Sequence, residues 1–354
     1  MVFHRRADLV IMAAVGMIVL SGLSGCGAKE EPEDTTPDIY TCAGAPASCL
    51  RIASGWTLEG TILSQGQTGN GGPDPFVVRL DDGRYRLYYA VSDVPADPDW
   101  WGLVSWISDD GLHFTKEAGY RYEDYTLFQH CIVRNTDGTW RMYWLDQKQG
   151  QVNGRGYKAI RSALSTDGGG TFTAEAGERL TFSGTGYELN GIGSARAIRL
   201  ASGEIRLYYA GIGSDHGRTL SAISPNGLDF TREDGVRLDI LCPPEAGLNG
   251  VSPVIDAAGT FHIFLWGTRC TGNYVNSKDG IFDGTTPDGL TITISNSPFI
   301  QGYSKDGTMN TWIHPEDFTV VQTPQGLRLY FILYGPNGPV TETALYSVIN
   351  TSIK

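Results

Sequence analysis

Basic residues are scarce in this sequence. Lysine and arginine together number 27 against 39 aspartates and glutamates, so the formal net charge is −12. A chain of this sign repels the phosphates of nucleic acids, which argues against a nucleic-acid-binding protein. Cysteine and histidine are also few, with 6 of each, and no spacing among them matches a zinc site. The charge suits a neutral or cationic ligand.

Long apolar runs are lacking as well. The run from Leu9 to Leu20 is too short and too poorly flanked for a stable membrane span. Arg5 and Arg6 precede it, an order typical of a secretion signal. Leu23-Ser-Gly-Cys26 then resembles a bacterial lipobox, in which the cysteine becomes the lipidated first residue. We therefore expect a signal peptide at 1–25 and lipidation of Cys26. The alternative is an ordinary signal peptide with a chance cysteine.

Residues 26–50 are predicted to form a flexible polar tether, followed by a folded domain at 51–354. Gly27 after the cysteine does not resemble a retention signal for the inner membrane. We therefore expect a lipid-anchored protein of the bacterial cell envelope, at the outer membrane or the cell surface.

The few cysteines are compatible with export, which permits disulfides. Cys42 and Cys49 are close enough for a local loop, and Cys242 with Cys270 would pair within one repeat. Cys131 is then left over, and we expect it to be a buried thiol.

Glycine and aromatic residues, by contrast, are abundant, with 46 Gly, 8 Trp, 17 Tyr and 13 Phe. One phrase recurs five times, a polar turn followed by an aromatic-rich strand such as Gly83-Arg-Tyr-Arg-Leu-Tyr-Tyr89. The turn glycines are Gly83, Gly138, Gly203, Gly259 and Gly326, at intervals of 55, 65, 56 and 67 residues. A period of this length, built from strands and tight turns, is typical of a propeller or a solenoid.

Each repeat is predicted to be a four-stranded sheet, whose third strand ends in an Asp-Gly or Asn-Gly turn. The last repeat stops after its third strand, and residues 56–63 carry the pattern of the missing fourth. We therefore predict an all-β fold, a five-bladed β-propeller of four-stranded blades whose ring is closed by an N-terminal strand. The blades are expected at 72–125, 126–183, 190–241, 248–300, and 312–354 with 56–63. A solenoid, the alternative, would not need the exchanged strand.

In a propeller the starts of the first strands surround the axis on one face, so functional side chains are expected there. Turn residues such as Asp82, Asp109 and Asp288 lie on the other face and are expected to be structural. Alignment of the first strands places around the axis Asp74, Gln129 or His130, Ser194 with Arg196, Ser252, and Glu316. The alternative is a ring of mutually satisfied polar side chains that caps the channel.

The loops on the same face hold aromatic and charged residues. The candidates are Trp100, Trp101, Asp215, Arg269 and His314, together with Tyr187 and Glu188 in a connection between blades. Aromatic rings stack on the CH surfaces of sugars, and carboxylates and amides bind hydroxyls, so a carbohydrate ligand is indicated. For the two tryptophans, packing within the loop is the alternative.

These features together resemble a known superfamily. Five blades, an early Asp-Pro at Asp74 and the repeated Asp-Gly-x-Tyr-x-Leu-Tyr-Tyr turn are similar to the five-bladed glycoside hydrolases of families 43, 32 and 68. The turn at Ser165 to Phe172 has the spacing of the Asp-box of sialidase-like propellers. The resemblance implies that Asp74 is the general base or nucleophile. It departs at blades three and four, where Ser194, Arg196 and Ser252 replace the acidic residues of those families.

Glycoside hydrolysis needs two carboxyl groups that flank the bond, one of them held protonated. We expect Asp74 to be the base or nucleophile and Glu316 the acid, with Glu188 as the second acid candidate. His130, Arg196 and His314 would bind substrate or tune those pKa values. No cofactor is expected, although the resemblance allows an axial calcium ion.

Two functions remain open at this point. One is a surface-tethered glycoside hydrolase that acts on an extracellular oligo- or polysaccharide through two carboxylates at the axial mouth. The other is a non-catalytic glycan-binding lipoprotein on the same fold, with a protein-interaction propeller behind both. The expected partners are carbohydrate and, through the lipid, a bacterial membrane, and the protein is expected to be a monomer.

Overall fold

The computed structural model describes residues 50–64, 67, 74–91, 101–124, 127–146, 150–239, 250–269, 278–304, 312–335, 338–339 and 344–354. The expected signal peptide, the lipidated Cys26, both expected cysteine pairs and Trp100 lie outside these residues. So do the side chains of Arg269 and His314. Strands dominate the described part, together with one 3-10 helix, η2 (Gly186–Glu188). Within it, no helix has the length and apolar character needed to cross a membrane.

The described strands form five sheets, which we number in chain order. Sheet 1 contains β3 (Phe76–Arg79), β4 (Tyr85–Val91), β5 (Trp101–Ser108), β6 (Thr115–Lys116) and β7 (Tyr122–Asp124). Sheet 2 contains β8 (Leu127–Arg134), β9 (Trp140–Asp146), β12 (Ala159–Ser165), β13 (Thr173–Ala174) and β14 (Leu180–Thr181). Sheet 3 contains β15 (Ile192–Arg199), β16 (Ile205–Ile212), β17 (Gly217–Ser224) and β18 (Thr231–Arg232), with β10 (Gln151–Val152) and β11 (Gly156–Tyr157) at its edge.

The last two sheets also recruit strands from the N-terminal end of the described chain. Sheet 4 contains β19 (Val251–Ile255), β20 (Phe261–Arg269), β21 (Lys278–Phe282), β22 (Gly284–Thr285), β23 (Thr293–Ile294), β24 (Ile300–Gln301) and β1 (Arg51–Ile52). Sheet 5 contains β26 (Trp312–Thr323), β27 (Gly326–Gly335), β29 (Leu345–Asn350), β2 (Thr57–Leu63), β25 (Tyr303–Ser304) and β28 (Gly338–Pro339). In sheet 5, β2 pairs antiparallel with β29.

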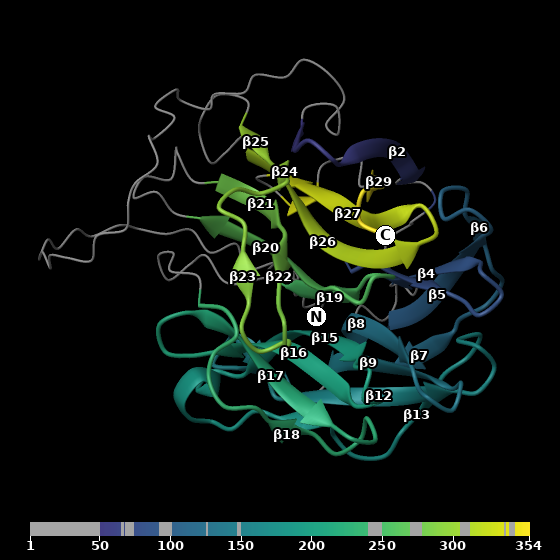
Figure 1. The fold of residues 1–354 in the computed structure, drawn as a ribbon. Coiled ribbons are helices and arrows are strands. Elements are labelled where there is room, and N and C mark those ends of the chain that lie inside the picture. The colour runs from purple at the N-terminus through teal and green to yellow at the C-terminus, as the bar shows by residue number, and fades with distance from the viewer. Residues whose placement is uncertain are drawn as a thin grey trace, which may run out of the picture. The chain divides into compact units, whose positions relative to one another are not determined.

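The sheets have a propeller-like arrangement, with their first strands innermost (Figure 1). Contacts run from β3 to β8, on to β15, β19 and β26, and from β26 back to β3. Hydrophobic clusters fill the spaces between neighbouring sheets. Strand β4 is buried at every residue because it has a sheet on each side. The prediction of a nearly all-β fold is therefore confirmed. The innermost strands are the place where a functional site is expected.

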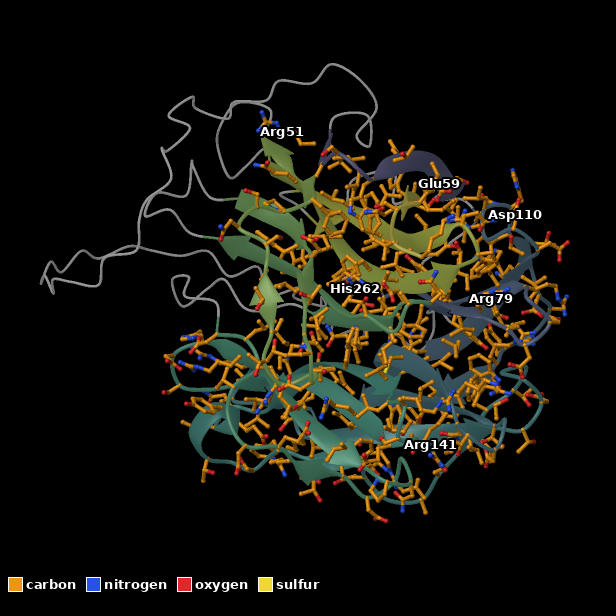
Figure 2. The ribbon with its side chains drawn as sticks, viewed as in Figure 1. Arg51, Glu59, Arg79, Asp110, Arg141 and His262 are labelled. Carbon is orange, nitrogen blue, oxygen red and sulfur yellow. The ribbon has the colours of Figure 1, made fainter. Side chains whose placement is uncertain are left out.

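A repeated polar contact joins the sheets, and Figure 2 labels Arg141 and Glu59, which take part in it. In sheet 1, Arg86 bonds both carboxylate oxygens of Glu117, at 2.7 and 3.0 Å, and donates to Gly168 O in a turn of sheet 2 at 2.8 Å. Tyr88 donates to Gly169 O of the same turn at 2.9 Å. Ser105 donates to Glu117 at 2.7 Å. We call this set the Arg–Glu–Tyr contact.

The Arg–Glu–Tyr contact recurs in three further sheets. The equivalent residues are Arg141, Glu175 and Tyr143 in sheet 2, Arg206, Glu233 and Tyr208 in sheet 3, and Arg328, Glu59 and Tyr330 in sheet 5. In sheet 5 the carboxylate is supplied by β2, 269 residues before its arginine. Arg328 and Tyr330 then donate to Asp110 O and Gly111 O in sheet 1. The contact therefore connects the last sheet to the first.

The acceptor turns are structural, as expected for the aspartates that precede their glycines. In the turn at the end of β12, Asp167 accepts from the backbone N–H and the hydroxyl of Thr171 at 2.9 and 2.8 Å. In the turn of sheet 1 this place is taken by Asp110, which accepts from the backbone N–H of Leu112 and His113. Asp109, expected to form that turn, lies one residue too early for those bonds and is exposed.

Substitution of Glu59 tests the contact that β2 makes with sheet 5. Glu59→Gln should lower the free energy of unfolding by about 3 kcal/mol, because it leaves the buried guanidinium of Arg328 without its counter-charge. Urea unfolding would measure the loss. Glu117→Gln in sheet 1 should behave alike, and Glu123→Gln, at an exposed position, should change stability by less than about 0.5 kcal/mol. A Glu59→Gln protein as stable as Glu123→Gln would contradict a stabilising role for β2.

Candidate functional site

Each innermost strand contains, or closely follows, a residue with a positive φ angle. Positive φ angles occur at Asp74 (87°), Gln129 (47°), Ser194 (43°) and Asp317 (40°), and Gly250 has a φ of 141°. Each of the five lies nine residues before the turn glycine of its own repeat. We call these five residues the inner ring. Such backbone conformations are costly for residues other than glycine and concentrate at functional sites.

Register shifts in the strand pairing accompany three residues of the inner ring, Gln129, Ser194 and Asp317. The pairing of β8 with β9 slips between Phe128 and Cys131, and that of β26 with β27 slips between Glu316 and Thr319. In sheet 3 the pairing of β15 with β16 shifts between Gly193 and Arg196. A bulge of this kind bends a strand and re-aims one side chain.

This register corrects the alignment made from the sequence. Phe76 pairs with Tyr88, and Thr319 pairs with Tyr330, the equivalent residue of sheet 5. Counting back two residues from each places Asp317, not Glu316, at the position of Asp74. The same count from Ser252, which pairs with Phe264, places Gly250 in the ring. Gln129 and Ser194 lie where the alignment put them.

Hydrogen bonds run from one ring residue to the next. The backbone N–H of Gln129 donates to Asp74 Oδ2 at 3.2 Å. The backbone N–H of Ser194 donates to Gln129 Oε1 at 2.8 Å. Each of these side chains therefore holds the bulge of the following sheet, which fixes the position of the Asp74 carboxyl group.

Asp74 is buried, and its pKa is raised above 3.8 because burial disfavours its charged form. Opposing this are the charge of Arg196, whose Nη2 lies 3.6 Å from Asp74 Oδ1, the bond from Gln129, and a side-chain hydrogen bond with Asp317. Burial and the charges of Asp317 and Asp74 also raise the pKa of the Tyr89 hydroxyl. Two carboxyl groups and one guanidinium thus share this site.

Several polar atoms around Asp74 are buried without a hydrogen-bond partner among the described residues. They are Asp74 Oδ1, Arg196 Nε and both ring nitrogens of His130. Arg196 instead lies over the ring of Phe76, 6.0 Å from its centroid, and donates to Ala195 O at 3.2 Å. Unpaired buried polar atoms are costly, so three side chains with such atoms around one carboxyl group indicate a site built for something other than stability.

His130 lies in this site as an uncharged group. It is fully buried, and burial followed by the nearby Arg196 lowers its pKa to about 3. Its ring can therefore exchange hydrogen bonds at neutral pH, but it does not supply positive charge.

An axial calcium ion does not fit these residues. The guanidinium of Arg196 already lies beside the Asp74 carboxyl group, so a divalent cation there would meet a positive charge. Within the described ranges, no group of three or more histidine, cysteine, aspartate or glutamate side chains could hold a metal ion.

Glu188 is held in an ion pair at η2. Its carboxylate accepts from Tyr209 Oη at 2.7 Å, from Arg232 Nε and Nη2 at 2.9 and 2.7 Å, and from the backbone N–H of Ser183 at 2.7 Å. Burial opposes ionisation, but the bonds from Arg232, Tyr209 and Ser183 outweigh it and lower the pKa. A carboxylate kept ionised in this way suits an anchor better than a general acid.

The remaining candidates are spread over the structure. Asp215 binds Arg218 through two bonds, at 2.9 and 2.8 Å. Trp101 begins β5 and packs against the cluster between sheets 1 and 2, rather than within the preceding loop segment. Glu316 is half-buried on β26, one residue before Asp317. Cys131 is a buried free thiol, as expected, and burial raises its pKa to about 11.

Asp317 is the residue that sequence reasoning missed. The signal that finds it is its distance of nine residues from Gly326, which equals the distance from Asp74 to Gly83. The alignment used the prolines before Asp74 and Glu316 instead, and the bulge displaces that match by one residue.

No known sequence family and no curated protein matches this chain. Solved structures match its fold. A thermostable glycoside hydrolase of family 43 has a TM-score of 0.53 at 14% identity, over 77% of this chain and 87% of its own. An endo-arabinase from Bacteroides thetaiotaomicron has 0.55 at 12%, over 80% and 94%. A protein of unknown function from Dyadobacter fermentans has 0.55 at 14%, over 84% and 100%. At these identities the likeness establishes the fold.

The raised pKa of Asp74 makes a prediction about stability. Because the pKa of Asp74 in the folded state lies above the ordinary 3.8, the unfolded chain loses this proton at a lower pH than the folded protein does. The free energy of unfolding therefore falls as pH rises from 3.8 to the pKa of the folded state. Asp74→Asn should therefore raise the melting temperature at pH 7, and the gain should vanish as pH falls toward 3.8. Melting curves of Asp74→Asn, of the parent and of the exposed control Asp109→Asn between pH 3.8 and pH 7 would test this prediction. A melting temperature lowered at every pH would identify Asp74 as a structural cap.

Proposed function

We propose that this protein is a glycoside hydrolase that acts on an extracellular oligo- or polysaccharide at the inner ring. The observation that carries the proposal is Asp74, a buried carboxyl group beside Arg196 on a strained backbone, with one oxygen that accepts no hydrogen bond from the described residues. A carboxyl group in such a place is poised to act on a ligand, because its charge state is set by its neighbours. The shared fold with glycoside hydrolases is consistent with this.

The proposal includes the finer architecture. The five sheets are the five blades of a propeller, and β2 closes the ring by adding the last strand to the fifth blade. Support comes from the unbroken series of contacts among the innermost strands and from the pairing of β2 with β29. The Arg–Glu–Tyr contact from sheet 5 to sheet 1 agrees with a closed ring.

In this mechanism Asp74 is the base or nucleophile. Its reactive partner must lie about 5–5.5 Å away for retention of configuration, or about 6.5–9.5 Å away for inversion. Asp317, whose side chain lowers the pKa of Asp74, sets the charge state of Asp74 together with Arg196. Glu316, one residue before Asp317 on β26, is the general acid. Glu188 holds its connection in place rather than donating the proton.

The remaining residues of the site bind the sugar. Neutral His130 and the guanidinium of Arg196 contact hydroxyl groups, because both have buried nitrogens without a partner within the described chain. Trp100, Arg269 and His314 are proposed to take part in binding the sugar. No cofactor is required for this reaction.

The location follows from the sequence. Lipidation of Cys26 after removal of residues 1–25 would anchor the protein in the bacterial envelope, with 26–50 as a tether. The partners are then carbohydrate and the membrane lipid, and the protein acts as a monomer.

A non-catalytic glycan-binding lipoprotein is the second candidate. Gly250 occupies the inner ring in sheet 4, so that sheet provides no carboxyl group at the position where the resemblance places the acid. The binding function keeps the ring and needs no proton donor.

Turnover decides between the two. The full-length protein in detergent would be assayed on arabinan, xylan, fructan, galactan and sialosides. We expect hydrolysis of one of them, lowered about 10²–10⁴-fold in Asp74→Asn and in Glu316→Gln, and unchanged in Asp109→Asn. Glu316→Gln alone should regain activity on aryl glycosides with good leaving groups, because these need no proton donor. Binding without turnover on any glycan would favour the second candidate.

Asp317 has its own expected outcome. Asp317→Ala removes the side-chain hydrogen bond that lowers the pKa of Asp74, so the acidic limb of the pH–rate profile should move to higher pH while the protein still turns over. The profile of kcat/KM against pH, compared with the parent, would measure the shift. An unmoved acidic limb would contradict a role for Asp317 in setting the charge state of Asp74.

A further inference from the structure

The connection between sheets 2 and 3 is held in place by the buried carboxylate of Glu188, and its neighbouring side chains are apolar and exposed. Glu188 fastens η2 through its four bonds to Tyr209, Arg232 and Ser183. On either side of it, Tyr187 is 48% exposed and Leu189 is 43% exposed. Only one other large hydrophobic residue of the described chain, Tyr120, is comparably exposed, at 37%. An anchored turn with exposed apolar residues is a candidate for ligand contact.

The ring of Tyr187 is also held from the side. The guanidinium of Arg218 lies 4.9 Å from its centroid, a cation–π contact. Arg218 is itself fixed, by Asp215 through two bonds and by Asp239 at 3.0 Å. His216 bonds Asp239 at 2.7 Å and completes the support. Two carboxylates and a guanidinium thus position an aromatic ring that remains half exposed, which lowers the entropic cost of using it in binding.

A pocket of about 230 Å³ lies beside this ring. Its lining includes Tyr187, Thr185, Leu220, Arg232 and Asp234. The volume is below the range of about 300–1,000 Å³ typical of sites for larger ligands, which suits a single sugar unit. The lining combines an aromatic face, an apolar floor and hydroxyl and charged groups at the margin.

We propose that this pocket, which we call the rim pocket, binds one uncharged sugar unit of a polysaccharide by stacking on Tyr187. The inference rests on the proposed function for its choice of ligand. The carboxylates of Glu188 and Glu233 are engaged by Arg232 and Arg206, and Asp234 adds negative charge, so an acidic sugar is disfavoured. The rim pocket would hold the polysaccharide while the inner ring acts on it.

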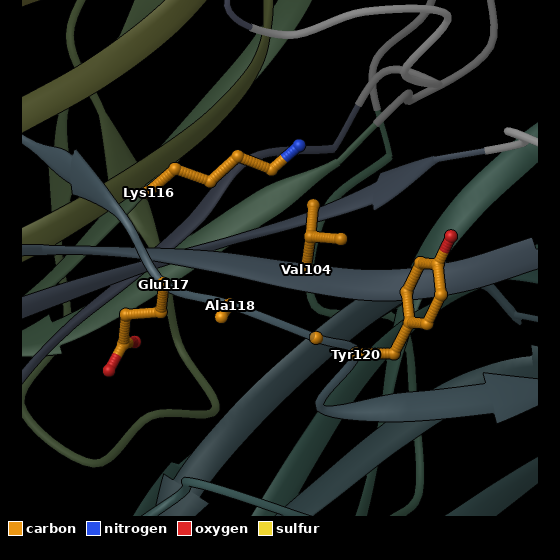
Figure 3. A pocket seen from close by; sticks show the side chains of 6 residues that line it. Val104, Lys116, Glu117, Ala118 and Tyr120 are labelled. Atoms are coloured by element: carbon orange, nitrogen blue, oxygen red, sulfur yellow. The ribbon is translucent and has the colours of Figure 1, made fainter.

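Sheet 1 has a pocket at the equivalent place, and it serves as a control (Figure 3). It measures about 410 Å³ and is lined by Val104, Lys116, Glu117, Gly119 and Tyr120. Its cation, Lys116, lies over the buried ring of Trp106 at 5.4 Å, so it does not position an exposed ring as Arg218 positions Tyr187.

The test separates binding from turnover. Full-length protein carrying Asp74→Asn would be run by affinity electrophoresis in gels containing arabinan, xylan, fructan or galactan. We expect retardation in one of these gels, reduced at least tenfold in apparent affinity by adding Tyr187→Ala. Tyr187→Phe should keep the affinity, because the ring remains, and Tyr120→Ala should leave it unchanged.

Each result bears on one proposal. Retardation unaffected by Tyr187→Ala, or no retardation in any gel, overturns the rim pocket, and turnover by the parent would still stand as evidence for the enzyme. Retardation that depends on Tyr187 without any turnover supports the rim pocket and overturns the hydrolase. An equal loss in Tyr120→Ala would also overturn the assignment, because the effect would not be specific to the clamped ring.

Discussion

The buried Arg–Glu pair that reaches into the next sheet is the interaction on which this fold depends. The arginine of the second strand binds a glutamate at the outer edge of the same sheet. It also donates to a backbone carbonyl in a turn of the next sheet. Sheet 4 departs from the rule, since His262 and Phe264 stand where the other sheets have arginine and tyrosine, and His262 bonds Asp256 instead. There the neighbouring sheets rely on aromatic packing, with Trp56 stacked on Phe299 at 4.4 Å and edge-on to Phe264.

That outer framework allows a strained centre. The positive φ angles of Asp74, Gln129, Ser194 and Asp317 cost free energy, and so do buried atoms without a hydrogen-bond partner in the described part of the chain, such as Asp74 Oδ1. The repeated polar contacts and the clusters between sheets offset those costs. Stability is therefore concentrated in the sheets, while the inner ring is left free to hold groups that a ligand would complete.

The sequence was sufficient for the repeat, and less so for the site. Turn glycines at a fixed spacing are a local signal, so the strands and turns around Gly83 and Gly138 could be predicted. Asp74 was found because Asp-Pro marks it, whereas Asp317 was missed because a bulge is set by the pairing of two distant strands. The ion pair of Glu188 and the lowered pKa of His130 depend on burial, which no spacing reveals.

The contribution of β2 to sheet 5 has a consequence for how the chain acquires its structure. Glu59 and Arg328 are separated by 269 residues, and the entropy lost in closing a loop of that length must be spent before their bond forms. Sheets 1 to 3 can assemble from pairings that are local in the sequence, but β1 has no partner until β24 of sheet 4 has formed, and β2 has none until β29 of sheet 5 has formed. Because pairings between residues far apart in the sequence form slowly, we expect the addition of β1 and β2 to be the last and slowest step of folding.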